Sequence, residues 1–348
     1  MRLVVWLCVF PSMVGCGDDA GQTPDAPPVD AAPGIEQDIE LVARETLPSG
    51  SWLLANNWDS DPNTAFVIPT TDFAAPRREL FAANRVWSMT GASDGSTIWF
   101  SAFDKAQETH FGLTYNDVVQ NTFAYDTATQ TARSVAMGPW ANVNDECHAP
   151  SRDGTKLYVC RRYDFIPPGA SFSGWRLGAF TLADGSFEFI RPGDGNTPFE
   201  LNPQELPGGS KLLFEMRARP PLTGSAIHTR DLATGTETMV RANATRPLLA
   251  PDGHRVLFRD TMTRRYRTLD LDQAGAQPVD VSPTMDPGSA AWSPDGNTIV
   301  YAVFDAAMSC DHLERVTYSG GTWSAPTRVR DCAITGEFIT DISWLTVP

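Results

Sequence analysis

The sequence lacks any excess of positive charge. Its 348 residues carry 27 Lys and Arg against 42 Asp and Glu, a net charge of −15. Because a phosphate backbone is bound mainly through cationic side chains, this balance argues against a nucleic-acid partner. Beyond residue 35 the sequence also lacks an apolar run of about 18 residues, the length that a transmembrane helix needs. An anionic membrane surface would repel the chain, so membrane attachment requires a dedicated anchor.

The first sixteen residues provide a candidate for that anchor. They read MRLVVWLCVFPSMVGC, in which Arg2 precedes an apolar segment that is too short to span a bilayer. The end of this segment, Met13-Val14-Gly15-Cys16, resembles the lipobox of bacterial lipoproteins, although Leu is more usual at its first position. The resemblance implies cleavage before Cys16 and lipidation of its sulfur, which anchors the protein through two acyl chains. An ordinary secretory peptide with a chance cysteine is the alternative.

The next residues have the composition of a tether. Residues 17–34 read GDDAGQTPDAPPVDAAPG and show no apolar periodicity, so they cannot bury a core. We therefore divide the chain into a signal peptide (1–15), a lipidated cysteine with a disordered linker (16–36) and one folded domain (37–348). This organisation predicts an outer-membrane lipoprotein of the bacterial cell envelope, facing either the periplasm or the exterior.

Cysteine usage agrees with export. Cys8 lies in the signal segment and Cys16 is the lipidation site, which leaves four cysteines: Cys147, Cys160, Cys310 and Cys332. An even number in an exported chain indicates two disulfides, with free buried thiols as the alternative.

A repeat organises the remaining sequence. Short turns such as SRDG, APDG and SPDG end at six glycines spaced 45, 59, 55, 44 and 43 residues apart, namely Gly50, Gly95, Gly154, Gly209, Gly253 and Gly296. The third residue after each glycine is aliphatic, and the fifth is large and apolar in five of the six copies. Alternating apolar residues after a turn predict a strand. A second strand–turn–strand pattern follows downstream in each copy.

Four antiparallel strands in each repeat of this length are typical of a propeller blade. The segments SPDGNTIVY and APDGHRVLF resemble the WD40-like repeat of TolB-type β-propellers, and the resemblance covers about residues 39–346. It implies an all-β, six-bladed β-propeller of four-stranded antiparallel blades. Two segments compete to complete the first blade and close the ring: residues 39–46 and the C-terminal stretch around Ile342-Ser343-Trp344.

The repeat also suggests how the cysteines pair. Cys147 lies seven residues before Gly154 and Cys160 lies six after it, so the two face each other across one hairpin. Cys310 follows the second strand of the sixth blade and Cys332 follows its fourth, which favours a second disulfide within that blade.

One turn contains a pattern that is typical of an enzyme. Gly91-Ala92-Ser93-Asp94-Gly95 matches the Gly-x-Ser-x-Gly nucleophile elbow of α/β-hydrolases. That elbow requires a following helix, whereas the β pattern STIWFSAF follows here. Because five sister turns occupy the same place in the repeat, we interpret Ser93 as a turn residue.

Metal sites have weak support in the sequence. Asp59-Ser60-Asp61-Pro62-Asn63 begins like a calcium loop but lacks the later glycine and the closing glutamate. We favour a surface turn there, with calcium as the alternative, and we expect no other cofactor. The five histidines show no zinc-binding spacing.

The longest predicted loops share one face of the ring. They and the adjacent strand ends carry aromatic and basic residues, the types that dominate binding hot spots. These candidate binding residues are Trp58, Tyr115, Arg161, Arg162, Tyr163, Phe165, Trp175, Arg217 and Arg219. Five acids at nearby strand ends are candidate channel-rim residues that pair with the arginines, in which case the arginines are structural: Asp59, Asp104, Asp164, Asp260 and Asp305.

Two functions remain open at this stage. A non-enzymatic, monomeric scaffold that binds a protein, peptide or glycan is the favoured interpretation, and it is the one that the TolB resemblance implies. The alternative is a carbohydrate-active enzyme or small-ligand binder with its site in the central channel. A fold of this kind supports either, so the side chains at the channel decide.

Overall fold

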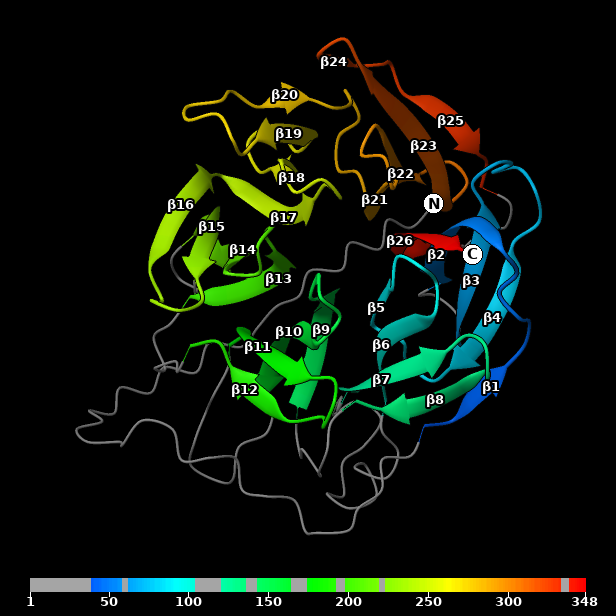
Figure 1. The fold of residues 1–348 in the computed structure, drawn as a ribbon. Helices are drawn as coiled ribbons and strands as arrows, with labels where there is room; N and C mark the ends of the chain where they lie inside the picture. Colours follow the sequence, from blue (N-terminus) through cyan, green and yellow to red (C-terminus); the bar gives the residue numbers. More distant parts are fainter. Residues whose placement is uncertain are drawn as a thin grey trace, which may run out of the picture.

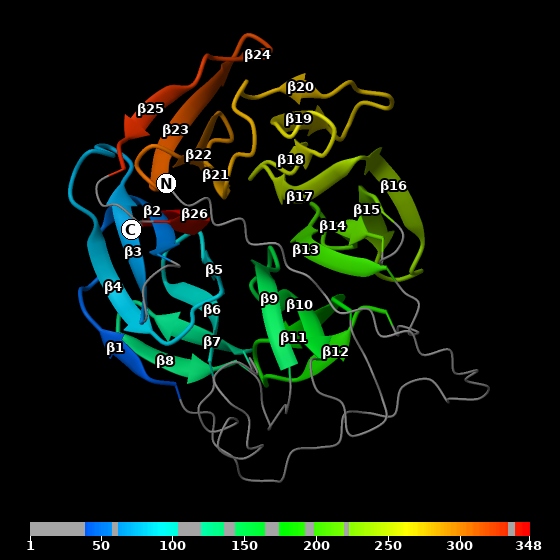
Figure 2. The same ribbon diagram turned by 180° about the vertical axis from the view of Figure 1, so that it is seen from behind.

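The chain forms a ring of small antiparallel β-sheets around a central axis (Figure 1). The computed structural model describes residues 39–57, 62–103, 120–135, 143–163, 174–191, 198–218, 223–332 and 338–348. All the regular elements in these residues are strands, and they form a propeller. The part of the chain that the structure describes contains no helix that could cross a bilayer. The expected all-β propeller is therefore confirmed. Seen from behind, the same strands surround the axis (Figure 2).

The first sheet contains segments from both ends of the chain. Its strands lie in the order β1-β4-β3-β2-β26. Their bounds are β1 (Leu41–Ala43), β2 (Gly50–Asn57), β3 (Asn63–Pro69), β4 (Arg78–Ala83) and β26 (Ile339–Val347).

The second sheet is twice the usual size. It has eight strands: β5 (Ser88–Gly91), β6 (Thr97–Phe103), β7 (Gln120–Asp126), β8 (Thr131–Ser134), β9 (Val143–Pro150), β10 (Lys156–Tyr163), β11 (Arg176–Thr181) and β12 (Phe187–Phe189). Two antiparallel groups, β5–β8 and β9–β12, are joined here by a single parallel pair between Gln120 and Asn144. Because of that pair, the described strands form five sheets and not the six separate sheets that the repeat predicts.

The other three sheets follow in chain order. One has β13 (Phe199–Glu205), β14 (Lys211–Arg217), β15 (Ser225–Asp231) and β16 (Glu237–Ala242), and the next has β17 (Ala244–Leu249), β18 (Arg255–Asp260), β19 (Tyr266–Asp270) and β20 (Val279–Asp280). The last has β21 (Ala290–Trp292), β22 (Thr298–Asp305), β23 (Cys310–Ser319), β24 (Thr322–Trp323) and β25 (Thr327–Arg330).

Both candidate closing segments are used, at opposite edges of the first sheet. The C-terminal strand β26 pairs with β2 and takes the innermost position, whereas β1 pairs with β4 at the outer edge. Arg330 from the last sheet adds a link across the junction, because its Nη1 donates to the carbonyls of Phe73 and Ala75 at 2.8 and 2.9 Å. The ring is thus closed by pairing two distant parts of the chain.

The repeat register places the core. The third and fifth residues after the six repeat glycines are all fully buried, from Leu53 and Ala55 in the first copy to Ile299 and Tyr301 in the last. The intervening fourth residue is also buried in every copy, as Trp99 and Leu257 illustrate. Each second strand is therefore covered on both faces, because neighbouring sheets pack against it from either side.

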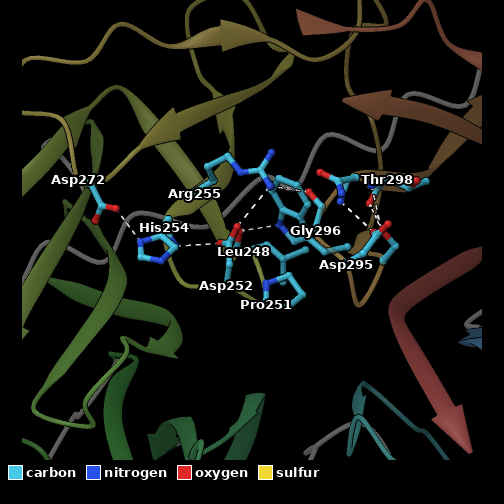
Figure 3. Close-up of polar contacts among 12 residues, drawn as sticks. Leu248, Pro251, Asp252, His254, Arg255, Asp272, Asp295, Gly296 and Thr298 are labelled. Carbon is cyan, nitrogen blue, oxygen red and sulfur yellow. Dashed lines mark hydrogen bonds and ion pairs between the residues drawn. The ribbon is translucent and has the colours of Figure 1, made fainter. Parts of the chain in front are cut away.

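The turns before these strands interlock from sheet to sheet on one face of the ring. In Figure 3, the Nη2 of Arg255 donates to the carbonyl of Gly296 in the next turn at 2.7 Å, and within one sheet Nδ1 of His254 lies 2.6 Å from Oδ2 of Asp272. Arg152 likewise donates from Nη2 to the carbonyl of Pro251 in another turn at 2.9 Å. Ser93 occupies the same kind of turn: the N–H of Gly95 donates to Ala92 at 2.8 Å, and β6 follows without a helix. The turn interpretation of GASDG is therefore confirmed.

The two expected disulfides are present. Cys147 is bonded to Cys160 across the β9–β10 hairpin, with 5.5 Å between their Cα atoms. Cys310 is bonded to Cys332, with 5.9 Å between their Cα atoms, and it ties the start of β23 to the segment after β25. The second bridge lies shortly before β26 in the chain.

We predict that Gly253→Ala destabilises the ring more than Gly154→Ala does. Both glycines have positive φ angles, +81° and +70°, so both substitutions carry the backbone cost of about 1–2 kcal/mol. A Cβ at Gly253 would lie 2.1 Å from Cγ of Pro207 in the neighbouring turn, whereas one at Gly154 would meet nothing within 4 Å. The overpacking adds about 1–3 kcal/mol. Urea unfolding measures both variants, and equal losses would contradict contact between the turns.

Candidate binding cavity at the centre of the ring

The centre of the ring contains a cavity of about 450 Å³. The innermost strand of each group contributes to its wall: β5, β9, β13, β17, β21 and β26. Figure 1 shows these six strands around the axis, with the other strands of each group farther from it. Most of the polar side chains in the wall are hydroxyls and amides, and the half-exposed indole of Trp87 also lines the cavity.

Four of the wall strands share one local distortion. At Cys147, Asn202, Arg246 and Asp341 the backbone has φ between 52° and 58°, and each residue lies at a β-bulge where two residues face one on the neighbouring strand. A bulge changes the direction of a side chain and bends the strand. All four bulged residues line the cavity. The first three lie seven residues before their turn glycine, so the repeat sets their position.

Glu215 connects two of these bulges. Its carboxylate is fully buried, and its Oε2 accepts from Nδ2 of Asn202 at 3.0 Å and from the backbone N–H of Arg246 at 2.9 Å. Its Oε1 accepts from Nε and Nη2 of Arg217 at 3.0 and 2.7 Å. The buried carboxylate of Glu215 therefore holds the side-chain amide of Asn202, the backbone of Arg246 and the side chain of Arg217 at the wall.

A hydrogen-bonded chain lies behind another part of the wall. The ring of His148 contacts Oγ of Ser88 through Nδ1 at 3.4 Å and Oγ1 of Thr122 through Nε2 at 3.2 Å. Thr122 donates to Asp145 at 3.1 Å, and a carboxylate only accepts. Thr122 must then accept from Nε2–H of His148, which leaves Nδ1 to accept from Ser88. The chain ends at Arg161, which forms two bonds of 2.7 and 2.8 Å to Asp145.

Burial controls the protonation of two residues in the wall. It raises the pKa of Asp341 to about 7, because the charged carboxylate is poorly solvated there. The Oδ2 atom of Asp341 is buried and has no hydrogen-bond partner among the described residues. Burial lowers the pKa of His148 to about 4, against the smaller opposing effect of Asp145. At neutral pH the histidine is therefore uncharged, and Asp341 is close to half ionised.

The predicted binding residues divide into several groups. Arg161 is 1% exposed, pairs with Asp145 and lies 3.7 Å from the ring centre of Phe187, so it is structural and not part of an exposed face. Arg162 lies over the ring of Trp175 at 5.1 Å. Of the candidates whose side chains the structure describes, Arg217 alone lines the cavity. Tyr163 ends β10, and its side chain lies outside the described part of the chain, as do four complete residues: Trp58, Tyr115, Phe165 and Arg219.

The predicted channel-rim acids do not line the cavity where the structure describes them. Asp260 accepts from the N–H groups of its own turn and pairs with Arg267 at 3.2 Å. Asp305 likewise closes a turn and lies 3.5 Å from Arg328. Both acids stabilise loops, so the expected pairing with the candidate arginines is wrong for them. Asp59, Asp104 and Asp164 lie outside the described residues.

The calcium alternative is not tested. Three of the five residues in the candidate loop, 59–61, are outside the described part, as are Cys16 and the linker. The residues that are described contain no group of three or more His, Cys, Asp or Glu side chains arranged to hold a metal ion.

Sequence reasoning missed most of the wall. Arg246, Asp341 and His148 lie in innermost strands and Glu215 lies in β14, whereas the candidates came mainly from long loops and the strand ends beside them. The repeat contained one usable signal, since the residue seven positions before the turn glycine lines the cavity in the last five copies: Ser88, Cys147, Asn202, Arg246 and Ser289. Glu215 and the Asp145 chain have no comparable signature in a single sequence.

Comparison with known proteins supports the fold and gives no family. No protein-family model matches the chain, and no curated protein matches it. Among solved structures, TolB from Acinetobacter baumannii is 13% identical with a TM-score of 0.62, over 87% of this chain and 68% of that one. A chain from a nidogen/laminin complex is 9% identical with a TM-score of 0.59, over 86% and 100%.

A third similar structure is an enzyme. Oligogalacturonate lyase in complex with manganese is 13% identical with a TM-score of 0.51, over 84% of this chain and 85% of that one. At these identities the likeness extends to the fold alone, which hosts both binding proteins and enzymes.

We predict that the stability of Asp341→Asn relative to wild type increases between pH 4 and pH 7 and is constant above it. The folded protein keeps the Asp341 proton up to pH of about 7, whereas the unfolded chain releases it near 3.8. Wild type therefore loses this contribution as pH rises through that window. The variant does not titrate, so thermal unfolding across pH measures the difference.

His148→Gln provides a comparison of opposite sign. The folded pKa of His148, about 4, lies below the unfolded value of 6.5, so wild type loses stability as pH falls through this range. The variant should gain relative to wild type on acidification. A pH-independent difference for either variant would contradict the burial of that group.

Proposed function

We propose that this chain is a lipid-anchored bacterial envelope protein, built as a six-bladed propeller, that binds a protein, peptide or glycan partner without chemical turnover. The six blades follow if the eight-stranded sheet is counted as two, since one residue pair joins its halves. The central cavity carries the proposal, because six strands converge on it with polar side chains that can fix the orientation of a ligand.

The two disulfides support an exported protein. Bridges such as Cys147–Cys160 and Cys310–Cys332 persist in oxidising compartments. Of the similar structures, one belongs to a complex of two proteins, nidogen and laminin, which favours a protein or peptide partner. The lipobox resemblance at Cys16 and the acidic linker support attachment to a membrane.

The arrangement around His148 supports binding more than nucleophilic catalysis. Ser88 and His148 are only 9% and 7% exposed, and Oγ of Ser88 already accepts from the N–H of Cys147 at 3.1 Å. A nucleophile has to reach its substrate. This hydroxyl instead joins β5 to β9, and the chain through Thr122 continues to β7.

One observation favours an enzyme as the second candidate. Asp341 lines the cavity with a pKa of about 7, a value suited to general acid–base chemistry near neutral pH. The channel-site enzyme therefore remains the alternative, with Asp341 as its acid or base.

For the anchor, we predict that Cys16→Ser releases the protein from the membrane fraction. The substitution removes the sulfur that would carry the lipid, and no other long apolar segment exists beyond residue 35. Cys8→Ser is the matched control, because it lies within the segment that is removed. Fractionation followed by immunoblotting gives the result. Equal membrane retention of both variants would contradict lipidation.

For the binding function, we predict that Ala290→Phe abolishes ligand binding. Ala290 lines the cavity, and a phenyl ring there would occupy part of its volume. Full-length protein in detergent is titrated with peptides and sugars while the emission of Trp87 and the other tryptophans is recorded. Ala233→Phe, at an exposed turn, is the control and should bind as wild type does.

The same titration separates the two candidate functions. A ligand recovered unchanged after prolonged incubation supports a binding protein. Conversion of the ligand that depends on Asp341 would overturn the proposal in favour of the enzyme. Equal binding by wild type and Ala290→Phe would show that the cavity is not the site.

A further inference from the structure

Arg246 brings a positive charge to the wall of the central cavity. Its side chain is exposed to the cavity, although it lies on the innermost strand β17. Its backbone N–H is held by Glu215, but its guanidinium forms no ion pair with an acid among the described residues. Guanidinium groups present five donors in a fixed fork that matches a carboxylate. The guanidinium hydrogen-bonds the hydroxyl of Tyr266, and its remaining donors are available to a ligand.

The surroundings of Arg246 extend across the cavity. Burial raises the pKa of Tyr266, and the guanidinium of Arg246 acts in the opposite direction on it. Burial raises the pKa of Asp341 on β26, and the positive charge of Arg246 lowers it. Tyr266, Asp341 and Arg246 all line the cavity. An electrostatic field from one cation thus reaches two titratable groups on different sheets.

A second arginine lies on the neighbouring sheet. Arg217 has a side chain that is 47% exposed, and it also lines the cavity. Glu215 holds its Nε and Nη2, so the charge of Arg217 is largely compensated. Asn202 adds an amide beside them, through the same carboxylate. The wall formed by β13, β14 and β17 is therefore rich in hydrogen-bond donors.

The opposite wall offers a carboxyl group with an unused atom. Oδ2 of Asp341 is buried without a hydrogen-bond partner among the described residues, while its backbone N–H donates to Oγ of Ser289 at 3.0 Å. A buried polar atom without a partner destabilises the fold, because it has lost its hydrogen bonds to water. A protonated Asp341 can satisfy that atom by donating to a ligand oxygen.

We propose that the cavity binds the carboxylate group of a small ligand between the guanidinium of Arg246 and the carboxyl of Asp341. This inference rests on the proposed binding function and names the ligand chemistry at the same site. Arg246 supplies the compensating charge, and the neutral form of Asp341 supplies a second donor. A bound carboxylate disfavours ionisation of Asp341, so binding takes up a proton.

The other charged groups at the cavity do not remove this preference. Glu146 and His148 lie on β9, and His148 is neutral above its low pKa. Arg217 on β14 favours an anion as well. A ligand amine would find Asp341, but it would also meet the positive field of Arg246. We therefore expect affinity for carboxylates to be highest below pH 7 and to fall as Asp341 ionises.

Isothermal titration of the full-length protein in detergent tests the site with two matched pairs of probes. N-acetylglycine is compared with N-acetylglycinamide, and glucuronate with glucose, so that each pair differs in the carboxylate. We expect at least one carboxylate to bind about tenfold more tightly than its neutral mate at pH 6. The pair that responds identifies a peptide-like or a sugar-like source.

Substitutions at two residues, Arg246 and Asp341, assign the effect to these side chains. Arg246→Gln should remove most of the carboxylate preference, and Arg246→Lys should restore part of it by keeping the charge without the fork. Asp341→Asn should keep binding at pH 6 but lose the decline between pH 6 and pH 8. Arg133→Gln, on the exposed part of β8, is the control and should change nothing. Unchanged melting temperatures show that each variant is folded.

The outcomes separate this inference from the proposed function. If neutral probes bind as tightly as carboxylates and Ala290→Phe still blocks them, the binding function stands and the carboxylate site is overturned. Binding that Arg246→Gln leaves intact also overturns it. Failure of both carboxylates to bind wild type removes the carboxylate site directly. A preference lost in Arg246→Gln and retained in Arg133→Gln supports it.

Discussion

The requirement that every sheet be covered on both faces governs this structure. Each second strand is buried at three successive positions after its turn glycine, so no sheet can end the stack with an open face. A ring satisfies the requirement because each sheet covers the next, provided that the last meets the first. Pairing of β26 with β2 and the bonds from Arg330 make that junction. Closure is thus a condition for the core and not an added feature.

The same closure creates the site. Closing the ring brings six strands together around the axis. Four of these strands bulge at a residue that lines the central cavity. Non-glycine residues in this backbone region carry strain, which tends to occur where structure serves function. The buried carboxylate of Glu215 offsets part of that cost by holding two bulges at once. Architecture and candidate chemistry therefore share their residues.

Much of the fold could be read from the sequence, because turn glycines and alternating apolar residues report local geometry. The glycine register predicted the six aliphatic positions after the turns, such as Leu53 and Ile299, which are buried in the core. It also predicted which cysteines lie close enough to pair. The site was less accessible to prediction. Arg161 looks like a loop cation in sequence, and only the fold reveals Asp145 beside it. Asp260 and Asp305 close their own turns, a local role that their positions at strand ends do not distinguish from a rim.

The placement of the two chain ends has a mechanical consequence. Among the described residues, the strand nearest the N-terminus is β1, a three-residue strand at the outer edge of the first sheet, whereas the strand that closes the ring is the nine-residue β26 at its inner edge. A pull on the chain before residue 39 is therefore applied first to β1, whose three paired positions can separate one after another. The ring can lose that strand and keep its closure. A protein held at this end would yield at its rim while its central cavity stayed intact.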